Sequence, residues 1–180
     1  EAVQVFYTRT DDHFLELSER AALANKSKVD FFQSIHINAT PTGTGFESFV
    51  YTEASSKSVA YQNVIHPEVM KAVGNVKDRG KKRANFAVIR ETNMPAILTE
   101  SLFIDNPADN KLLKQDVFLD KVAQGHVNGY VKAFGLKKKV ASAPVVKAEE
   151  KKVYRVQVGA FSDKTNADQL VEDLNKKGYT

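Results

Sequence analysis

The chain has 180 residues, of which 42% are hydrophobic and 27% charged, and its formal net charge is +4. This composition indicates a globular protein rather than a disordered one, and no apolar run approaches the roughly 18 residues that a membrane-spanning helix requires. Cysteine is absent, which excludes disulfides, thiolate zinc sites and a cysteine nucleophile.

The first residues predict a strand followed by a helix. Residues 2–8 alternate as a strand does, and the apolar side chains of residues 14–25 recur at helical spacing. Because the chain begins with Glu1 rather than Met and enters this strand at once, we expect it to be a piece of a longer protein. The lack of a visible signal peptide therefore says little about export.

A buried strand is predicted over residues 31–38, where aromatic and β-branched residues dominate and a Thr/Pro/Gly turn follows. Alternate side chains of a strand face opposite ways, so His36 shares a face with Ser34 and Asn38. The end of such a strand is a common place for ligands and catalytic groups. On spacing alone, a hydrogen-bonded structural histidine is the simpler interpretation.

The middle of the chain predicts a strand over residues 46–51 and two helical pieces over residues 55–65 and 67–73. Pro67 fits the first turn of the second piece, where its missing N–H costs nothing. His66, directly before it, is interpreted as a local cap and not as a ligand.

Residues 77–83 carry five positive charges and predict a basic loop. Two interpretations of this loop stay open. It is a solvated connection, or it is the lip of a cleft that attracts anionic glycan or peptide carboxylates.

Further strands are predicted at residues 86–89 and 96–99, with Glu100 at the exit of the second, and residues 107–134 are expected to be helical. Strands alternating with helices predict an α/β domain with a mixed, largely parallel sheet flanked by helices. The carboxyl ends of strands form the site in such sheets, so His36 and Glu100 are expected to converge across one cleft. A lone Glu after a strand is, by itself, more often a solvated end.

The character of the chain changes after residue 135. Residues 136–152 have small, charged and Pro residues with no sustained period, which is typical of a linker. Residues 153–161 then alternate as a strand, and residues 166–177 have apolar side chains at helical spacing. The tail therefore predicts one partial βα unit over residues 153–180.

Several ordered motifs resemble the Amidase_3 type of N-acetylmuramoyl-L-alanine amidase, a family of cell-wall hydrolases. The match covers roughly residues 1–135, and it includes Thr8-Arg9-Thr10-Asp11, Leu17-Ser18-Glu19-Arg20, Ser34-Ile35-His36-Ile37-Asn38, Gly45-Phe46-Glu47, Arg79-Gly80, Pro95-Ala96-Ile97-Leu98-Thr99-Glu100 and Phe103-Ile104-Asp105-Asn106. The resemblance implies a zinc enzyme that cuts the amide between muramic acid and L-alanine in peptidoglycan.

The resemblance also implies the roles of individual residues. His36 would be a zinc ligand and Glu100 the general base that takes a proton from the zinc-bound water. Glu47, Asn38 and Arg20 would support the site or be structural. The family draws two further zinc ligands, a His and a Glu, from sequence that would precede Glu1, so we expect this fragment to bind zinc poorly and to be inactive.

The tail resembles the opening half of a SPOR domain, a module that binds peptidoglycan glycan strands, and Gln157 and Phe161 belong to its signature. The expected organisation is an amidase domain over 1–135 that lacks its N-terminal part, a linker over 136–152 and a partial SPOR-like domain over 153–180. We expect a bacterial protein that is extracellular or associated with the cell wall, with anionic wall polymers as further partners.

Three other functions compete with this interpretation. A non-catalytic peptidoglycan-binding protein would use the SPOR-like tail, and retention of both His36 and Glu100 speaks weakly against it. A nucleic-acid binder would need aromatics interleaved with cations on an exposed sheet, whereas the cations here fall in a loop and a linker, so nucleic acid is not an expected partner. Ser34 and His36 as a nucleophile pair lack a nucleophile elbow.

Overall fold

A computed structural model describes residues 3–40, 42–137, 172 and 176. The helices and strands discussed below lie within residues 15–139, which belong to one compact unit. In chain order they are α1 (Leu17–Ser27), β1 (Phe32–Asn38), β2 (Phe46–Tyr51), α2 (Ser56–Val73), β3 (Asp78–Ala84), α3 (Ala87–Arg90), β4 (Ala96–Phe103), α4 (Pro107–Leu113) and α5 (Asp116–Ala133). In the described part of the chain, no helix is long and apolar enough to cross a membrane.

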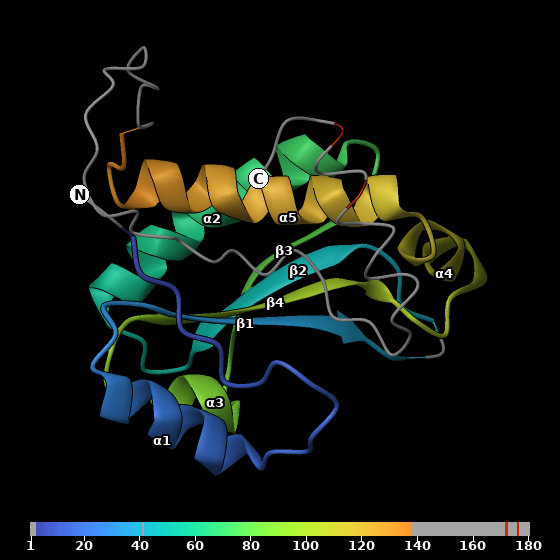
Figure 1. Cartoon of the computed structure of the whole chain (residues 1–180). Helices are drawn as coiled ribbons and strands as arrows, with labels where there is room; N and C mark the ends of the chain where they lie inside the picture. The colour runs from blue at the N-terminus through green and yellow to red at the C-terminus, as the bar shows by residue number, and fades with distance from the viewer. Residues whose placement is uncertain (1–2, 41, 138–171, 173–175, 177–180) are drawn as a thin grey trace. The chain divides into compact units, whose positions relative to one another are not determined.

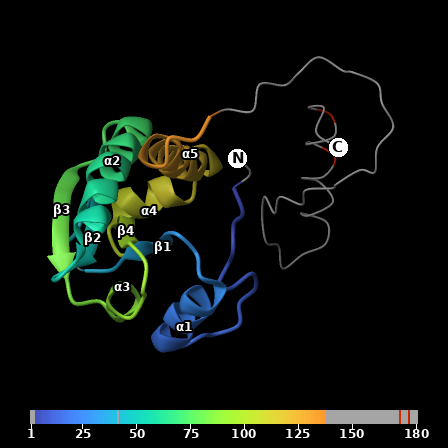
Figure 2. The same ribbon diagram turned by 90° about the vertical axis from the view of Figure 1, so that its left-hand side faces the viewer.

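The four strands form one mixed sheet in the order β1-β4-β2-β3 (Figure 1). β1 pairs with β4 in parallel, β2 pairs with β3 in parallel, and β2 and β4 are antiparallel. Two of the three pairings are therefore parallel, which confirms the predicted α/β architecture with a mixed, largely parallel sheet. Helices cover both faces, with α2 and α5 on one and α1 and α3 on the other (Figure 2).

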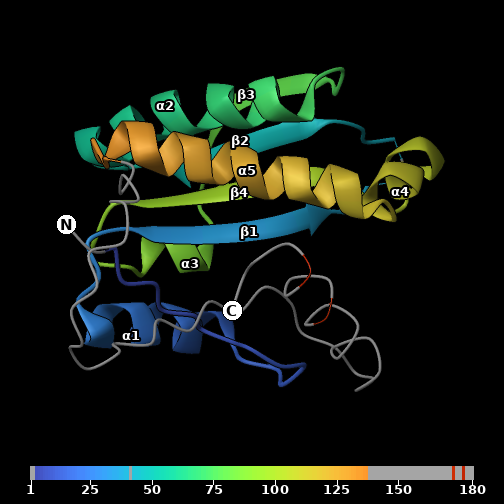
Figure 3. The ribbon, with the colours of Figure 1, turned by 45° about the horizontal axis from the view of Figure 1, so that its top comes forward.

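The larger core lies between the sheet and the pair α2 and α5, which run side by side along it (Figure 3). Its buried residues are Phe46, Val50, Ile65, Val69, Val73, Ile97, Leu102, Phe118 and Val122. A smaller cluster on the opposite face joins α1 and α3 to the beginnings of β1 and β4 through Ala24, Phe32, Val88, Ile89, Ala96 and Leu98. The ends of β1 and β4 extend beyond α3 (Figure 1).

Two strands each contain one extra residue that breaks the alternation of side chains. Opposite Phe46 and Ser48 of β2, β3 advances by three residues, and Gly80 takes φ +86° there. Opposite His36 and Asn38 of β1, β4 also advances by three, and Leu102 takes φ +70°. Such bulges turn the following side chains to the other face of the sheet. Leu102 thereby enters the larger core, although Glu100 points to the opposite face.

The N-terminal prediction was partly wrong. Residues 3–8 form no strand, and Val3, Val5 and Tyr7 are more than half exposed. An isolated extended segment without a neighbouring strand leaves its backbone groups to water. The helix predicted over residues 14–25 begins at Leu17, because the backbone N–H of Glu16 donates to the side chain of Glu19 and so caps the helix. Leu17, the first apolar residue of this helix, is exposed.

The two helical pieces predicted over residues 55–65 and 67–73 are one continuous helix, α2, with Pro67 inside it. Burial of Ile65 and Val69 against the sheet outweighs the single hydrogen bond that Pro67 cannot make. His66 is not a local cap. It is 4% exposed and bridges Ser48 and Asp78.

The basic segment over residues 77–83 is not a loop but mostly strand β3, at one edge of the sheet. Charged side chains are common on edge strands, where they discourage further pairing. Residues 86–89, predicted as a strand, are an extended Phe86 followed by the four-residue helix α3. A short apolar run does not distinguish a strand from a buried helical turn.

Most of the remaining elements agree with the prediction, but the strand predicted over residues 96–99 extends to Phe103, so Glu100 lies within β4 and not at its exit. β1 and β2 have nearly the predicted bounds, and residues 107–133 form two helices separated at residues 114–115. β1 is nevertheless an edge strand and not a fully buried one, since Ile35 and Ile37 are 54% and 46% exposed. The predicted linker and βα unit lie almost wholly outside the described residues.

Candidate active site

Three of the residues singled out from the sequence lie in one row across the sheet. His36 of β1 is the direct partner of Glu100 in β4, and Glu100 is the direct partner of Glu47 in β2. Partners in a sheet point to the same face, and neighbouring strands lie about 5 Å apart. The row therefore places an imidazole and two carboxyl groups side by side, on the face where β1 and β4 extend beyond α3 (Figure 1).

Glu47 is a buried carboxylate held by three donors. Asn38 Nδ2 donates to Oε1 at 2.8 Å, Arg79 Nε donates to Oε2 at 2.9 Å, and Lys82 Nζ also donates to Oε2. Burial alone would raise the pKa of Glu47, but the hydrogen bonds and charges of Lys82 and Arg79 keep that pKa below its ordinary value. Glu47 is thus a fixed negative charge at neutral pH.

Glu100 is a different kind of carboxyl group. Burial, helped by the negative charge of Glu47, raises the pKa of Glu100 to about 7. Its Oε2 atom is buried and has no hydrogen-bond partner among the described residues. A carboxyl group whose pKa is near neutrality can both accept and return a proton at physiological pH, which is the property that a general acid–base catalyst needs.

His36 lies beside Glu100 and is only partly buried. Its Nε2 atom and the hydroxyl of Ser34 are 2.7 Å apart and share a hydrogen bond. Ser34 is itself buried, at 9% exposure, so it is placed to orient the imidazole and not to meet a substrate.

Arg79 and Lys82 belong to the site, although the sequence analysis gave neither of them a role of its own: Arg79 stood in the Arg79-Gly80 motif and Lys82 among the charges of the basic segment. In a regular strand, residues three apart face opposite ways, but the extra residue at Gly80 lets both cations reach Glu47 from β3. The five positive charges of this segment favoured the prediction of a loop, whereas the structure has a strand there. Besides the Arg79-Gly80 motif, a signal lay in Gly80 itself, since a glycine within a strand often marks a bulge.

Asp109 of α4 holds the strand ends that lie beside the row. This buried carboxylate accepts hydrogen bonds from the backbone N–H groups of Gly45 and Phe103 and from the hydroxyl of Thr44. The start of β2 and the end of β4 are therefore fixed to each other just beyond Glu47 and Glu100. Asn106 caps α4 by accepting from the N–H groups of Ala108 and Asp109.

The other residues named from the sequence do not join the row. Arg20 of α1 donates to the carbonyl of Leu15, a contact at the entry of its own helix. Gln157 and Phe161 lie outside the described residues. Among the remaining histidines, His126 is buried between Thr99 and the carbonyl of Val122, and burial lowers its pKa.

The described residues do not by themselves fit a zinc ion. They contain no group of three His, Cys, Asp or Glu side chains that could hold a metal. His36 can supply one nitrogen, whereas both oxygens of Glu47 are already engaged by donors. A catalytic zinc commonly has three protein ligands, so His36 accounts for one ligand of such a site.

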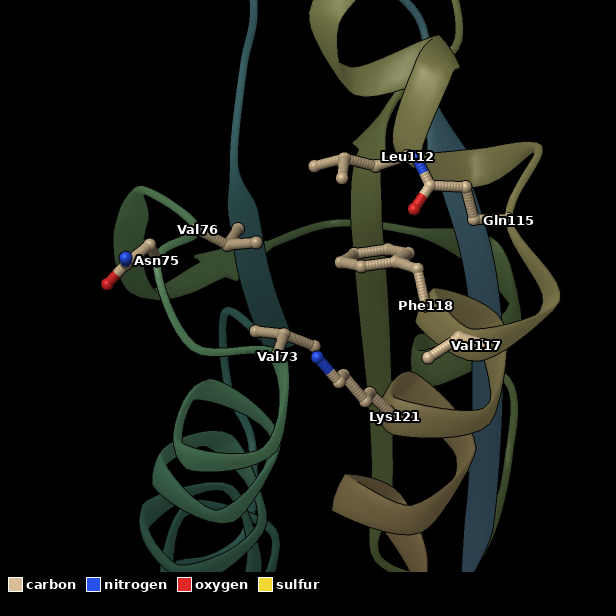
Figure 4. A pocket seen from close by; sticks show the side chains of 8 residues that line it. All are labelled: Val73, Asn75, Val76, Leu112, Gln115, Val117, Phe118 and Lys121. Carbon is tan, nitrogen blue, oxygen red and sulfur yellow. The ribbon is translucent and has the colours of Figure 1, made fainter.

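A separate pocket of about 170 Å³ lies between the end of α2 and the junction of α4 with α5 (Figure 4). Val73, Val76, Leu112 and Phe118 line it with apolar side chains, and Lys121 reaches in from α5. None of its lining residues belongs to the row of His36, Glu100 and Glu47. The candidate active site is therefore distinct from this pocket.

Family models match both parts of the chain. Residues 1–132 match the Amidase_3 model, N-acetylmuramoyl-L-alanine amidase, and residues 135–180 match the SPOR domain model. The chain resembles a sporulation-specific N-acetylmuramoyl-L-alanine amidase of Bacillus subtilis (strain 168), with 44% identity over 179 residues, and the N-acetylmuramoyl-L-alanine amidase CwlM of Bacillus licheniformis, with 42% identity over 177 residues. These two alignments cover 99% and 98% of this chain but 66% and 65% of the relatives.

A phage protein is also similar. The chain is 49% identical over 154 residues to an endolysin of Bacillus phage SPP1, an alignment that covers 83% of this chain and 56% of the endolysin. The chain thus spans about two thirds, or less, of the lengths of these curated relatives.

Solved structures share the fold. The catalytic domain of CwlV, an N-acetylmuramoyl-L-alanine amidase from Bacillus (Paenibacillus) polymyxa var. colistinus, superposes with a TM-score of 0.69 at 38% identity and covers 74% of each chain. An N-acetylmuramoyl-L-alanine amidase from Clostridium difficile 630 gives 0.70 at 36% identity, covering 74% of this chain and 73% of that one. The mixed sheet with helices on both faces is therefore that of amidase catalytic domains. The chain belongs to the Amidase_3 family of N-acetylmuramoyl-L-alanine amidases.

Proposed function

We propose that the protein to which this chain belongs cuts the amide between N-acetylmuramic acid and L-alanine in peptidoglycan. The observation that carries this proposal is the row of His36, Glu100 and Glu47 on three neighbouring strands, in a chain that belongs to an amidase family. The names of its relatives support the same bond as the substrate.

Glu100 is the proposed general base. A pKa of about 7 leaves a large fraction of Glu100 ionised at neutral pH, so it can take a proton from the attacking water. The protonated carboxyl can then deliver that proton to the nitrogen of the departing L-alanine. Glu47 stays ionised throughout, and its charge keeps the proton affinity of Glu100 high.

Zinc is the proposed cofactor of the complete enzyme, where a bound ion would lower the pKa of its water. His36 is the ligand that this chain supplies, and Ser34 holds its imidazole through Nε2. The described residues contain no three-ligand group, and on the resemblance to the amidase family we propose that a His and a Glu from sequence preceding Glu1 in the longer protein complete the site. The 180-residue chain alone is then expected to bind zinc weakly and to leave peptidoglycan uncut.

The decisive experiment measures new N-terminal L-alanine released from purified peptidoglycan. The full-length protein should release it without creating reducing sugar ends, which separates an amidase from a glycosidase. Glu100→Gln should lower the rate by about 10²–10⁴-fold, the usual contribution of a general base. His36→Ala should reduce both the rate and the bound zinc.

Glu53→Gln is the matched control, because it removes an exposed carboxylate that is not part of the row. Full activity of Glu100→Gln would exclude Glu100 as the base. Turnover of cell wall by the unextended 180-residue chain, abolished by a chelator, would show that our account of the zinc ligands is wrong.

A second candidate function is peptidoglycan binding without catalysis, favoured by the match of residues 135–180 to the SPOR model. In the proposed organisation, an amidase domain over 1–135 and a linker over 136–152 precede a partial SPOR-like domain over 153–180, with Gln157 and Phe161 contacting glycan. Retention on glycan strands stripped of their stem peptides, lost when residues 153–180 are removed, would support this role. Peptidoglycan, and not nucleic acid, is the proposed partner, and the cell wall is the proposed location.

A further inference from the structure

Arg79 holds its guanidinium in a fixed orientation beside the row. Its Nε atom donates to Glu47 at 2.9 Å, and the guanidinium carbon lies 4.8 Å from the centre of the Phe103 ring. Phe103 is itself fully buried, in a space that only a glycine at position 43 leaves open, because a Cβ there would lie 2.1 Å from the ring. One edge and one face of the guanidinium are therefore occupied.

The two terminal nitrogens of Arg79 are left to donate elsewhere. Among the described residues they make no hydrogen bond, and the side chain is 27% exposed. Two parallel N–H groups match the two oxygens of a carboxylate. Glu47 carries one negative charge against the two positive charges of Arg79 and Lys82, so one positive charge remains uncompensated in this cluster.

The guanidinium lies within reach of the reacting bond. Glu47, which it contacts, is the direct strand partner of Glu100. With strands about 5 Å apart, the free nitrogens of Arg79 lie within about 10 Å of the Glu100 carboxyl group. One residue of extended chain spans about 3.5 Å, so a carboxylate one or two residues beyond the amide being cut can reach Arg79.

We propose that Arg79 is a specificity-determining residue that binds the carboxylate of the second residue of the stem peptide, so the enzyme prefers peptidoglycan in which this γ-linked glutamate is a free acid rather than an amide. The inference rests on the proposed amidase function. The guanidinium of Arg79 is held in place and has two nitrogens left to donate. A carboxylate of the substrate matches it in shape and in charge. An amide offers the fork one acceptor oxygen in place of two and carries no charge.

The test compares two muramyl peptides that differ only in having a carboxylate or a carboxamide on the second residue. The full-length, zinc-loaded protein should show a kcat/KM about 10- to 100-fold higher for the acid, the usual value of a charge-assisted bidentate contact. Arg79→Gln should lose this preference through a rise in KM for the acid alone. Arg79→Lys, which keeps the charge but not the fork, should recover only part of it.

Arg83→Gln is the control, because it removes the same charge from an exposed residue of the same strand, where Arg83 binds the carbonyl of Thr52. It should retain the preference for the acid. Equal rates of the unsubstituted enzyme on both substrates would overturn the proposal. So would an Arg79→Gln enzyme that slows equally on both, since a purely structural role gives that result.

Failure of the proposed function looks different, because then neither substrate is cut. A binding measurement then tests the preference for a carboxylate. L-alanyl-γ-D-glutamate and its amide are each titrated into the 180-residue chain, and NMR spectra are recorded. Perturbation of the Arg79 guanidinium signals by the acid and not by the amide supports the contact. The same response to both peptides, or to neither, refutes it.

Discussion

Glu47 and Glu100 are direct partners in the sheet, yet they differ in chemistry. Glu47 receives three donors and stays ionised, whereas Glu100 has a buried oxygen without a partner in the described part of the chain and a pKa raised to about 7. Two carboxyl groups with separated pKa values are a common arrangement of acid–base sites. At the scale of single residues, the donors around a carboxylate thus decide whether it is a fixed charge or a proton carrier.

Ionisation of the Glu100 carboxyl group should lower the free energy of unfolding. The raised pKa means that the contribution of Glu100 to stability is fully present below pH 4.5 and is lost as the pH rises through about 7. Glu100→Gln in the 180-residue chain with chelator should therefore increase the free energy of unfolding at pH 8 by on the order of 1 kcal/mol. The gain should be much smaller at pH 5.

Urea unfolding at the two pH values checks this expectation. Glu53→Gln, an exposed carboxylate, should change stability little at either pH. An equal gain from Glu100→Gln at pH 5 and pH 8 would mean that the substitution acts through packing and not through ionisation.

Two glycines set how closely the helices α2 and α5 approach. A Cβ at Gly129 would lie 2.9 Å from the Cα of Ile65, and one at Gly125 would lie 2.7 Å from the Cα of Val69. Both contacts are with backbone atoms, which cannot move aside as a flexible side chain does. At the scale of elements, these glycines keep α5 close enough for His126 to reach Thr99 on β4.

Gly129→Ala should therefore destabilise the protein, although alanine is the better helix former. Separation of α2 and α5 should cost about 1–3 kcal/mol, the usual penalty for overpacking a core. Thermal unfolding measures this loss. Asn128→Ala is the control, since it changes the exposed neighbouring residue of the same helix, and it should have little effect; stabilisation by Gly129→Ala would contradict the contact argument.

The acid response belongs to the whole molecule, because its two buried histidines join different elements. His66 links α2 to β2 and β3, and His126 links α5 to β4. Burial lowers the pKa of both imidazoles below 6.5, and for His66 the neighbouring Asp78 only partly offsets this. The unfolded chain then binds the protons first, so stability should fall as the pH drops below about 6.5.

We expect a loss of up to about 1.4 kcal/mol per pH unit for each imidazole between pH 6.5 and 5. The measurement is urea unfolding in the Glu100→Gln background, because Glu100 acts in the opposite direction over the same range. His126→Gln should flatten the pH dependence, while His13→Gln, at an exposed position, should leave it unchanged. An unchanged slope in His126→Gln would show that this histidine does not carry the effect.

Much of this architecture could be predicted from the sequence where one pattern dominated. The apolar and aromatic residues of β2 and β4 and the helical spacing in α5 indicated these elements, and His36 and Glu100 are neighbours as expected, although Glu100 lies within β4 and not at its exit. β3 was missed because charges mask an edge strand, and α3 because four apolar residues fit either structure. The register that pairs Glu47 with Glu100, and the two cations on Glu47, depend on contacts between distant segments that no local pattern encodes.

The extra residue in β4 has a consequence for changes of chain length. Leu102 is the extra residue at which the alternation of side chains is interrupted: Ser101 and Leu102 both face the larger core, and Phe103 faces Arg79 on the side of Glu100. Deleting Leu102 would restore regular alternation and leave Phe103 facing Arg79, while the larger core would lose the Leu102 side chain. A one-residue deletion here should therefore leave the row of His36, Glu100 and Glu47 on its face and remove one core side chain, whereas a deletion in the regular part of β4 would reverse the faces of all residues on one side of the deletion.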